Sequence, residues 1–268
     1  MSRPPLRAGR IIGIIILCGF VAVLAWGFTR PAKTPASRRL VEAEKQLREI
    51  AINQEQREDA QLTRQLLGEN LSDRRFSFAT IVLATADRKV IPLNRDLESH
   101  QRVIRAINAA LEESTKELSQ EDSPIRKLRR INEGSRFFEE ALMAKIDAEE
   151  GLSCEIPTTR EGEHQRSGYP DLKVTDLKSG DVFYLDPKLV EQSSWQSTFR
   201  SFYFEPKTKT LKINDHAVHL LVGIGHDGNR GAWTFGDYKI VDLSELSVRL
   251  KAEFQASNAD LYKMEDPE

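Results

Sequence analysis

Two short alternating runs around a glycine-containing turn, within residues 170–188, constrain this chain more than any other stretch. A Lys-Ser-Gly turn separates the run at 172–177 from the run at 181–188. This pattern predicts a β-hairpin. Because side chains alternate between the two faces of a strand, Asp186 and Lys188 are expected on the same face of the second strand.

The turn decides which residues of the two strands face each other. A two-residue loop at 178–179 pairs Asp171 with Asp186, whereas a three-residue loop with a bulge at Gly180 shifts the pairing by one. Directly opposite residues have Cβ atoms about 4.5–5.5 Å apart, and like charges in that position destabilise a sheet. A fold alone gives no reason for such a pair. A divalent cation explains it, because Mg²⁺ is typically held by one or two carboxylates together with substrate phosphate.

Pro170-Asp171, followed after a hairpin by Asp186-Pro187-Lys188, resembles the motif of the PD-(D/E)xK nuclease superfamily. The motif is short. The resemblance implies an α/β (α+β) fold of the restriction-endonuclease-like type, in which helices flank a mixed four-to-five-stranded sheet. In this chain a transmembrane helix and a long polar helix are expected to precede that fold.

The resemblance also implies the site residues. Asp171 and Asp186 are expected to bind Mg²⁺ or Mn²⁺, and Lys188 is expected to position or activate the attacking water. The helix before the first core strand often contributes a glutamate in this superfamily. This implies Glu139, with Glu140 as the alternative and surface glutamates as the other interpretation.

Pro187 departs from the superfamily pattern, which usually has an apolar residue able to join the ladder at this position. Proline removes a ladder hydrogen bond and is unusual in a central strand. Either the ladder ends at Asp186, or this is not a nuclease strand. In the second case the hairpin is exposed and its charges are merely solvated.

Residues 11–28 form a long apolar run without a charged residue. As a helix the run spans about 27 Å, close to the ~30 Å hydrocarbon core of a bilayer. We therefore predict a retained transmembrane helix in a single-pass protein, and the flanking charges slightly favour a cytoplasmic C-terminal domain. The alternative is a signal peptide cleaved after residue 25, which would give a secreted or periplasmic protein.

The region after this run is strongly polar. Two prolines mark a linker, and the following Gln-, Glu- and Arg-rich segment predicts a helical stalk of weak coiled-coil character, which offers a surface for self-association. A solvated spacer helix is the alternative. The predicted organisation is a basic tail (1–10), a transmembrane helix (11–28), a linker (29–37), the stalk (38–70), a nuclease-like α/β domain (76–262, with its core at about 124–246) and a tail (263–268).

Hydrophobic periodicity predicts the elements of the α/β domain. They are a hairpin over 76–93, helices over 94–119 and 124–150, a first core strand over 152–158, a fourth core strand over 220–225, a further strand over 233–243 and a closing helix over 246–262. The second helix begins with a basic cluster, Arg126, Lys127, Arg129 and Arg130. Such a cluster either contacts phosphate or is a solvated face.

Net charge and cysteine content exclude two classes of protein. The formal net charge of −2 excludes the global basic field of a DNA-coating protein, and two cysteines do not make a disulfide framework. Three functions are to be considered, of which the first is what the resemblance implies. The first is a membrane-anchored, metal-dependent nuclease-like protein that hydrolyses nucleic acid, preferentially DNA. The others are an inactive nuclease-fold binding module and a coiled-coil membrane scaffold.

Overall fold

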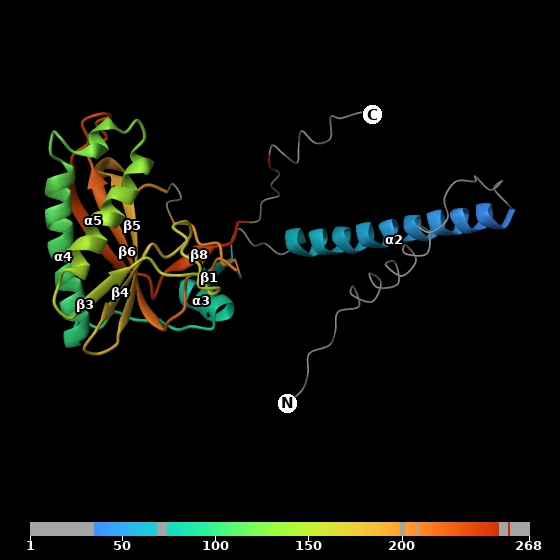
Figure 1. Cartoon of the computed structure of the whole chain (residues 1–268), viewed down its shortest axis with the longest axis horizontal. Coiled ribbons are helices and arrows are strands. Elements are labelled where there is room, and N and C mark those ends of the chain that lie inside the picture. Colours follow the sequence, from blue (N-terminus) through green and yellow to red (C-terminus); the bar gives the residue numbers. More distant parts are fainter. Residues whose placement is uncertain (1–34, 69–73, 199–201, 208, 252–256, 258–268) are drawn as a thin grey trace, which may run out of the picture. The chain divides into compact units, whose positions relative to one another are not determined.

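The computed structural model describes residues 35–68, 74–198, 202–207, 209–251 and 257. The chain divides into two compact units, Met1–Glu69 and Asn70–Glu268. In the first unit the described residues form helix α2 (Pro35–Gly68), which covers most of the predicted stalk (Figure 1). Its described side chains are nearly all exposed, including Leu47 and Ile50, and they give no support to the coiled-coil interpretation.

The predicted fold class is wrong in one respect. Within the described residues, no helix is both long enough and apolar enough to cross a membrane. The run at 11–28 lies outside those residues. The described architecture is therefore a mixed α/β fold without a membrane-spanning helix, and membrane association finds no support in it.

The second unit is built on a mixed six-stranded sheet. Its strands are β2 (Val90–Ile91), β3 (Leu152–Glu155), β4 (Leu172–Asp176), β5 (Val182–Glu191), β6 (Ala217–His226) and β7 (Phe235–Asp242). The order is β2-β6-β5-β4-β3, and β7 also pairs with β6. Strands β3, β4 and β5 are antiparallel neighbours, whereas β5 and β6 run parallel. The long β6 is buried almost throughout, as expected for a central strand.

Helices cover both faces of this sheet. On one face lie α4 (Glu98–Leu118) and α5 (Ser135–Asp147), whose apolar residues form the larger core with β5 and β6 (Figure 1). The other face is partly covered by α3 (Phe78–Ala86). Strands β1 (Arg75–Ser77) and β8 (Ser247–Arg249) form a separate antiparallel pair on that side.

Two predicted elements are wrong, and a third is wrong where it begins. The hairpin over 76–93 is replaced by β1, α3 and β2, because Phe78, Val82 and Ala86 recur at helical spacing and are buried together. The helix over 124–150 is interrupted, since two 3₁₀ turns, η1 (Pro124–Lys127) and η2 (Ile131–Gly134), precede α5. The closing helix predicted over 246–262 does not begin as expected, because β8 occupies 247–249. Residues 252–256 and 258–262 lie outside the described part, so the prediction for them stays untested.

Candidate active site

The β4–β5 hairpin has the register predicted from a two-residue loop. Leu172 of β4 faces Leu185 of β5, so the next positions outward are Asp171 and Asp186. The Asp171 N–H donates a hydrogen bond to the Leu185 carbonyl at 3.1 Å. The two carboxylates therefore meet at the open end of the hairpin, where β4 begins.

Pro187 stays within the ladder and faces Val222 of β6. Successive residues of a strand direct their backbone groups to opposite sides, so Pro187 and Leu185 direct theirs to the same side. The Leu185 carbonyl accepts from Asp171, which places that side toward β4. Strand β4 starts only at Leu172, so no strand lies opposite the Pro187 nitrogen, and its missing N–H costs no ladder hydrogen bond.

Lys188 joins the two carboxylates into one cluster. Its Nζ lies 2.9 Å from Asp186 Oδ2 and 3.6 Å from Asp171 Oδ2. The Asp186 side chain is only 4% exposed, whereas that of Lys188 is 32% exposed. The structure thus brings Asp171, Asp186 and Lys188 together, with the lysine on the solvent side.

Burial controls the protonation of this cluster. It raises the pKa of Asp186 to about 7; the Lys188 ammonium opposes that rise and the Asp171 carboxylate adds to it. Burial also acts to lower the pKa of Lys188, but attraction to Asp186 and Asp171 outweighs it, so the net shift is upward. Lys188 therefore stays protonated. Its single positive charge cannot balance the negative charges of both Asp171 and Asp186.

A buried aromatic layer lies behind the carboxylates. The Tyr169 hydroxyl is 2.7 Å from His219 Nδ1, and the two rings stack. Burial lowers the pKa of His219 to about 3, so its imidazole is neutral at ordinary pH. Burial raises the pKa of Tyr169, and the charges of Asp186 and Asp171 add to that rise, so the layer lies near both carboxylates.

Glu139 of helix α5 lies near the cluster and interacts with its charges. Burial raises the pKa of Glu139 and the charge of Asp171 adds to this, while the positive charges of Arg166, Lys188 and Lys212 act against it. Glu139 is thus in electrostatic contact with the cluster. Glu140, the alternative, is instead paired with Arg166 at 2.9 Å on the exposed side of the helix.

Sequence reasoning missed Lys212, whose side chain is completely buried. Its Nζ donates a long hydrogen bond, 3.5 Å, to the Arg166 carbonyl. Burial lowers the pKa of Lys212, while the charges of Asp171, Glu139 and Asp186 oppose that change. The sequence around Lys212 carries no motif or periodicity that distinguishes it from an exposed lysine, so no signal was available to find it.

The donor set fits a hard divalent cation. Asp186 Oδ2 is buried and accepts no hydrogen bond of acceptable geometry, even though Lys188 Nζ approaches it closely. Asp171 and Asp186 offer two carboxylates, the number with which Mg²⁺ is typically held, alongside water and phosphate. Among the described residues no group of three or more His, Cys, Asp or Glu is arranged to hold a metal ion.

The family profile that matches this chain is that of the type II restriction enzyme MjaV family, over residues 71–265. The chain belongs to this family. The chain is also 27% identical over 199 residues to the type II restriction enzyme MjaV of Methanocaldococcus jannaschii, covering 70% of this chain and 86% of that protein. No solved structure matches the chain.

Membership of the MjaV family confirms the restriction-endonuclease-like superfamily that the hairpin motif predicted. The MjaV-family region begins where the second compact unit begins, and it includes every residue of the cluster. The basic cluster predicted from the sequence lies in the same region. Arg126 donates to the Ser119 carbonyl at 3.2 Å, whereas Arg129 and Arg130 line a hollow of about 490 Å³ together with Arg230.

Proposed function

We propose that the chain is a metal-dependent nuclease that hydrolyses phosphodiester bonds of DNA. The observation that carries this proposal is the convergence of Asp171, Asp186 and Lys188 at the open end of one hairpin. Family membership supports the reaction class, and the relative described as a type II restriction enzyme supports DNA as the substrate.

Each residue has a distinct role in the proposed reaction. Asp171 and Asp186 would hold Mg²⁺ or Mn²⁺, which would supply Lewis-acid stabilisation of the attacked phosphoryl group. Lys188 remains charged beside them and stabilises the negative charge that develops on the phosphoryl oxygens. Glu139 adds a third carboxyl at the edge of the cluster, which increases the demand for a cation.

A cleavage assay tests the proposal. The full chain is incubated with double-stranded DNA, single-stranded DNA and RNA of matched sequence, with Mg²⁺, with Mn²⁺ or with a chelator. We expect cleavage of duplex DNA that requires the metal and is lost in Asp171→Asn and Asp186→Asn. Lys178→Met removes an exposed lysine of the hairpin turn and is the matched control, with activity like that of the unmodified protein.

Metal-dependent cleavage that persists in both aspartate variants would place the reaction elsewhere in the protein. Absence of cleavage on every substrate, with both metals and with folded protein, would leave only a binding role for this cluster. Preferential cleavage of RNA would retain the chemistry and correct the substrate.

A further inference from the structure

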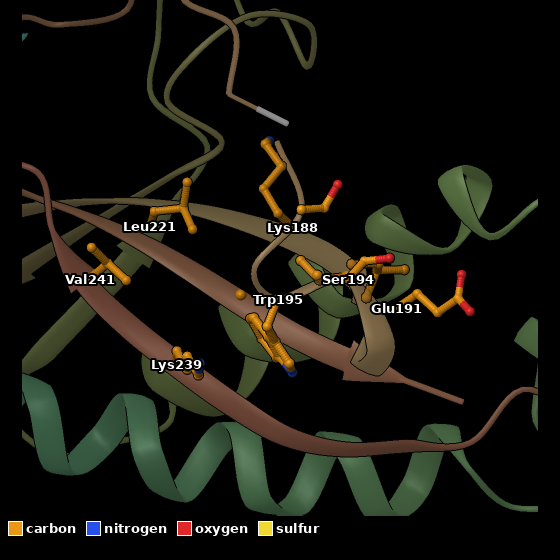
Figure 2. A pocket seen from close by; sticks show the side chains of 11 residues that line it. Lys188, Glu191, Ser194, Trp195, Leu221, Lys239 and Val241 are labelled. Carbon is orange, nitrogen blue, oxygen red and sulfur yellow. The ribbon is translucent and has the colours of Figure 1, made fainter. Parts of the chain in front are cut away.

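A hollow of about 410 Å³ opens beside the catalytic cluster, on the face of the sheet that carries Asp186 (Figure 2). Three residues form a row across adjacent strands here. Lys188 of β5 faces Gly223 of β6, and Gly223 faces Lys239 of β7. Two strand spacings, about 9.5 Å, separate the Cα atoms of the two lysines. Because the middle residue is glycine, β6 places no side chain between them.

The next row forms the floor of the hollow. Asp186 faces Leu221, which faces Val241, so the floor is apolar and leads directly away from the buried carboxylate. Figure 2 shows Leu221 and Val241 along one edge of the hollow, with Lys188, Trp195 and Lys239 together beside them. An apolar floor beside a row that carries a cation at each end suits a sugar–phosphate backbone better than it suits a free metal ion or a purely apolar ligand.

The Trp195 ring covers the glycine in the middle of the row, between the two lysines. Its indole packs so closely on β6 that a Cβ added at Gly223 would lie 2.9 Å from the ring, and one added at Gly225 would lie 3.3 Å from it. The Lys239 ammonium lies over this ring, 4.5 Å from its centroid. Such a cation–π contact orients an ammonium without neutralising its charge.

The two lysines differ in their anionic partners. Lys188 is engaged with Asp186 and Asp171, whereas no carboxylate of the described residues lies within ion-pairing distance of Lys239. Glu191 also lines the hollow, and its carboxylate accepts a hydrogen bond from the Ser193 hydroxyl at 3.1 Å. The positive charge that remains uncompensated is therefore that of Lys239.

We propose that Lys239 binds the phosphate next to the scissile one, so that the row Lys188–Gly223–Lys239 follows the backbone of the cleaved strand. This inference rests on the proposed function, which puts the scissile phosphate at Lys188. Each nucleotide of a strand carries one negative charge, so a second cation across the hollow meets a second phosphate. Trp195 is a positioning residue that holds Lys239 in place.

Salt-dependent DNA binding tests this assignment directly. Full-length protein is titrated onto a labelled duplex in chelator between about 50 and 300 mM salt. A lost phosphate contact lowers the slope of log K against log salt by about 0.9. We expect this loss in Lys239→Met, little change in Lys239→Arg, which keeps the charge, and none in the control Lys178→Met. In the presence of Mg²⁺, Lys239→Met should raise KM about 5- to 10-fold and leave kcat within about twofold of its value in the unmodified protein. The reason is that a contact with a neighbouring phosphate stabilises the bound substrate and the transition state equally, so its loss weakens both by the same amount.

The possible failures are distinguishable. If the unmodified protein cleaves DNA but Lys239→Met and Lys178→Met have the same slope and KM, the phosphate contact is refuted while the proposed function stands. A lower melting temperature in Lys239→Met with an unchanged slope refutes it as well, because it assigns Lys239 only to packing against Trp195. If no DNA is cleaved but Lys239→Met still loses about one unit of slope, the backbone contact stands and the nuclease proposal falls.

Discussion

Asp186 carries a charge that the surrounding fold stabilises poorly. Burial, with the help of Asp171, raises its pKa from 3.8 to about 7, so the folded protein retains a proton that the unfolded chain has already released. A raised acid pKa contributes stability that is complete at low pH and is lost as the pH rises. Through Asp186 alone, the free energy of unfolding should therefore fall between about pH 4 and pH 7.

Asp186→Asn should remove this loss. In metal-free buffer at pH 8 we expect the variant to be more stable than the unmodified protein by about 1–3 kcal/mol, and the two should converge near pH 4. Chemical unfolding at several pH values measures the difference. A variant that is less stable at pH 8 would instead assign Asp186 a structural role.

Lys188 separates chemistry from metal binding, because an ammonium is not a metal ligand. Lys188→Ala should reduce single-turnover cleavage about 10²- to 10³-fold, the usual effect of removing one group that stabilises transition-state charge. Mn²⁺ affinity, measured by calorimetry, should change little. Lys173→Ala, on the same hairpin but paired with Asp215 at 3.0 Å, is the matched control. Full activity in Lys188→Ala would remove this lysine from the site.

As an element, the β4–β5 hairpin differs at its two ends. At the turn, Asp176 is fully buried but satisfied: Arg102 of α4 donates to its Oδ2 at 2.7 Å, and the backbone N–H groups of Lys178 and Ser179 donate to Oδ1. Burial acts to raise the pKa of Asp176, but these donors outweigh it and lower the pKa to about 2. The buried carboxylate at the turn end is thus stabilised by its donors. At the open end, the Asp186 carboxylate lacks such donors and needs a cation.

Arg102→Met should therefore destabilise the fold. Removing one partner of a buried ion pair typically costs about 3–5 kcal/mol. A lowered acid pKa gives stability above the unfolded value that is lost as the pH falls through the folded value, so the cost should shrink between about pH 4 and pH 2. Urea unfolding at pH 7 and pH 3 measures this, with the exposed Arg105→Met as control. An equal cost at both pH values would contradict the ion-pair explanation.

The hairpin could be predicted because its information is local. Alternation and the turn residues limited the pairing to two registers one residue apart, and the structure has the one that brings Asp171 beside Asp186. Pro187 could not be resolved in the same way, since its tolerance depends on where the neighbouring strand begins. Only the assembled sheet shows that no strand lies opposite its nitrogen.

The missed features depend on contacts between distant segments. The run at 76–83 is rich in β-formers, yet Phe78 is buried as part of a helix that packs with Tyr169 and residues near 204. Lys212 is another case, since it is buried and its ammonium interacts with Arg166 and Glu139, which lie far from it in sequence. Neither local propensity nor spacing carries such information.

For the whole molecule, two observations place the proposed activity in the second compact unit. The family match begins at residue 71, and the described core residues all lie between 78 and 243. The described side chains of α2 are nearly all exposed, so that helix contributes little buried surface of its own. The fold and the site therefore draw their described contacts from residues 70–268.

A fragment of residues 70–268 should accordingly fold and act alone. We expect one cooperative thermal transition within about 4 °C of that of the full chain, which corresponds to less than roughly 1 kcal/mol. We also expect kcat/KM for DNA cleavage within about threefold of the full chain, since less than 0.7 kcal/mol of transition-state stabilisation should be lost. Calorimetry and the cleavage assay measure both quantities. A folded fragment with a much lower kcat/KM would show that residues 1–69 contribute to DNA binding or to assembly, because Asp171, Asp186 and Lys188 all lie within the fragment.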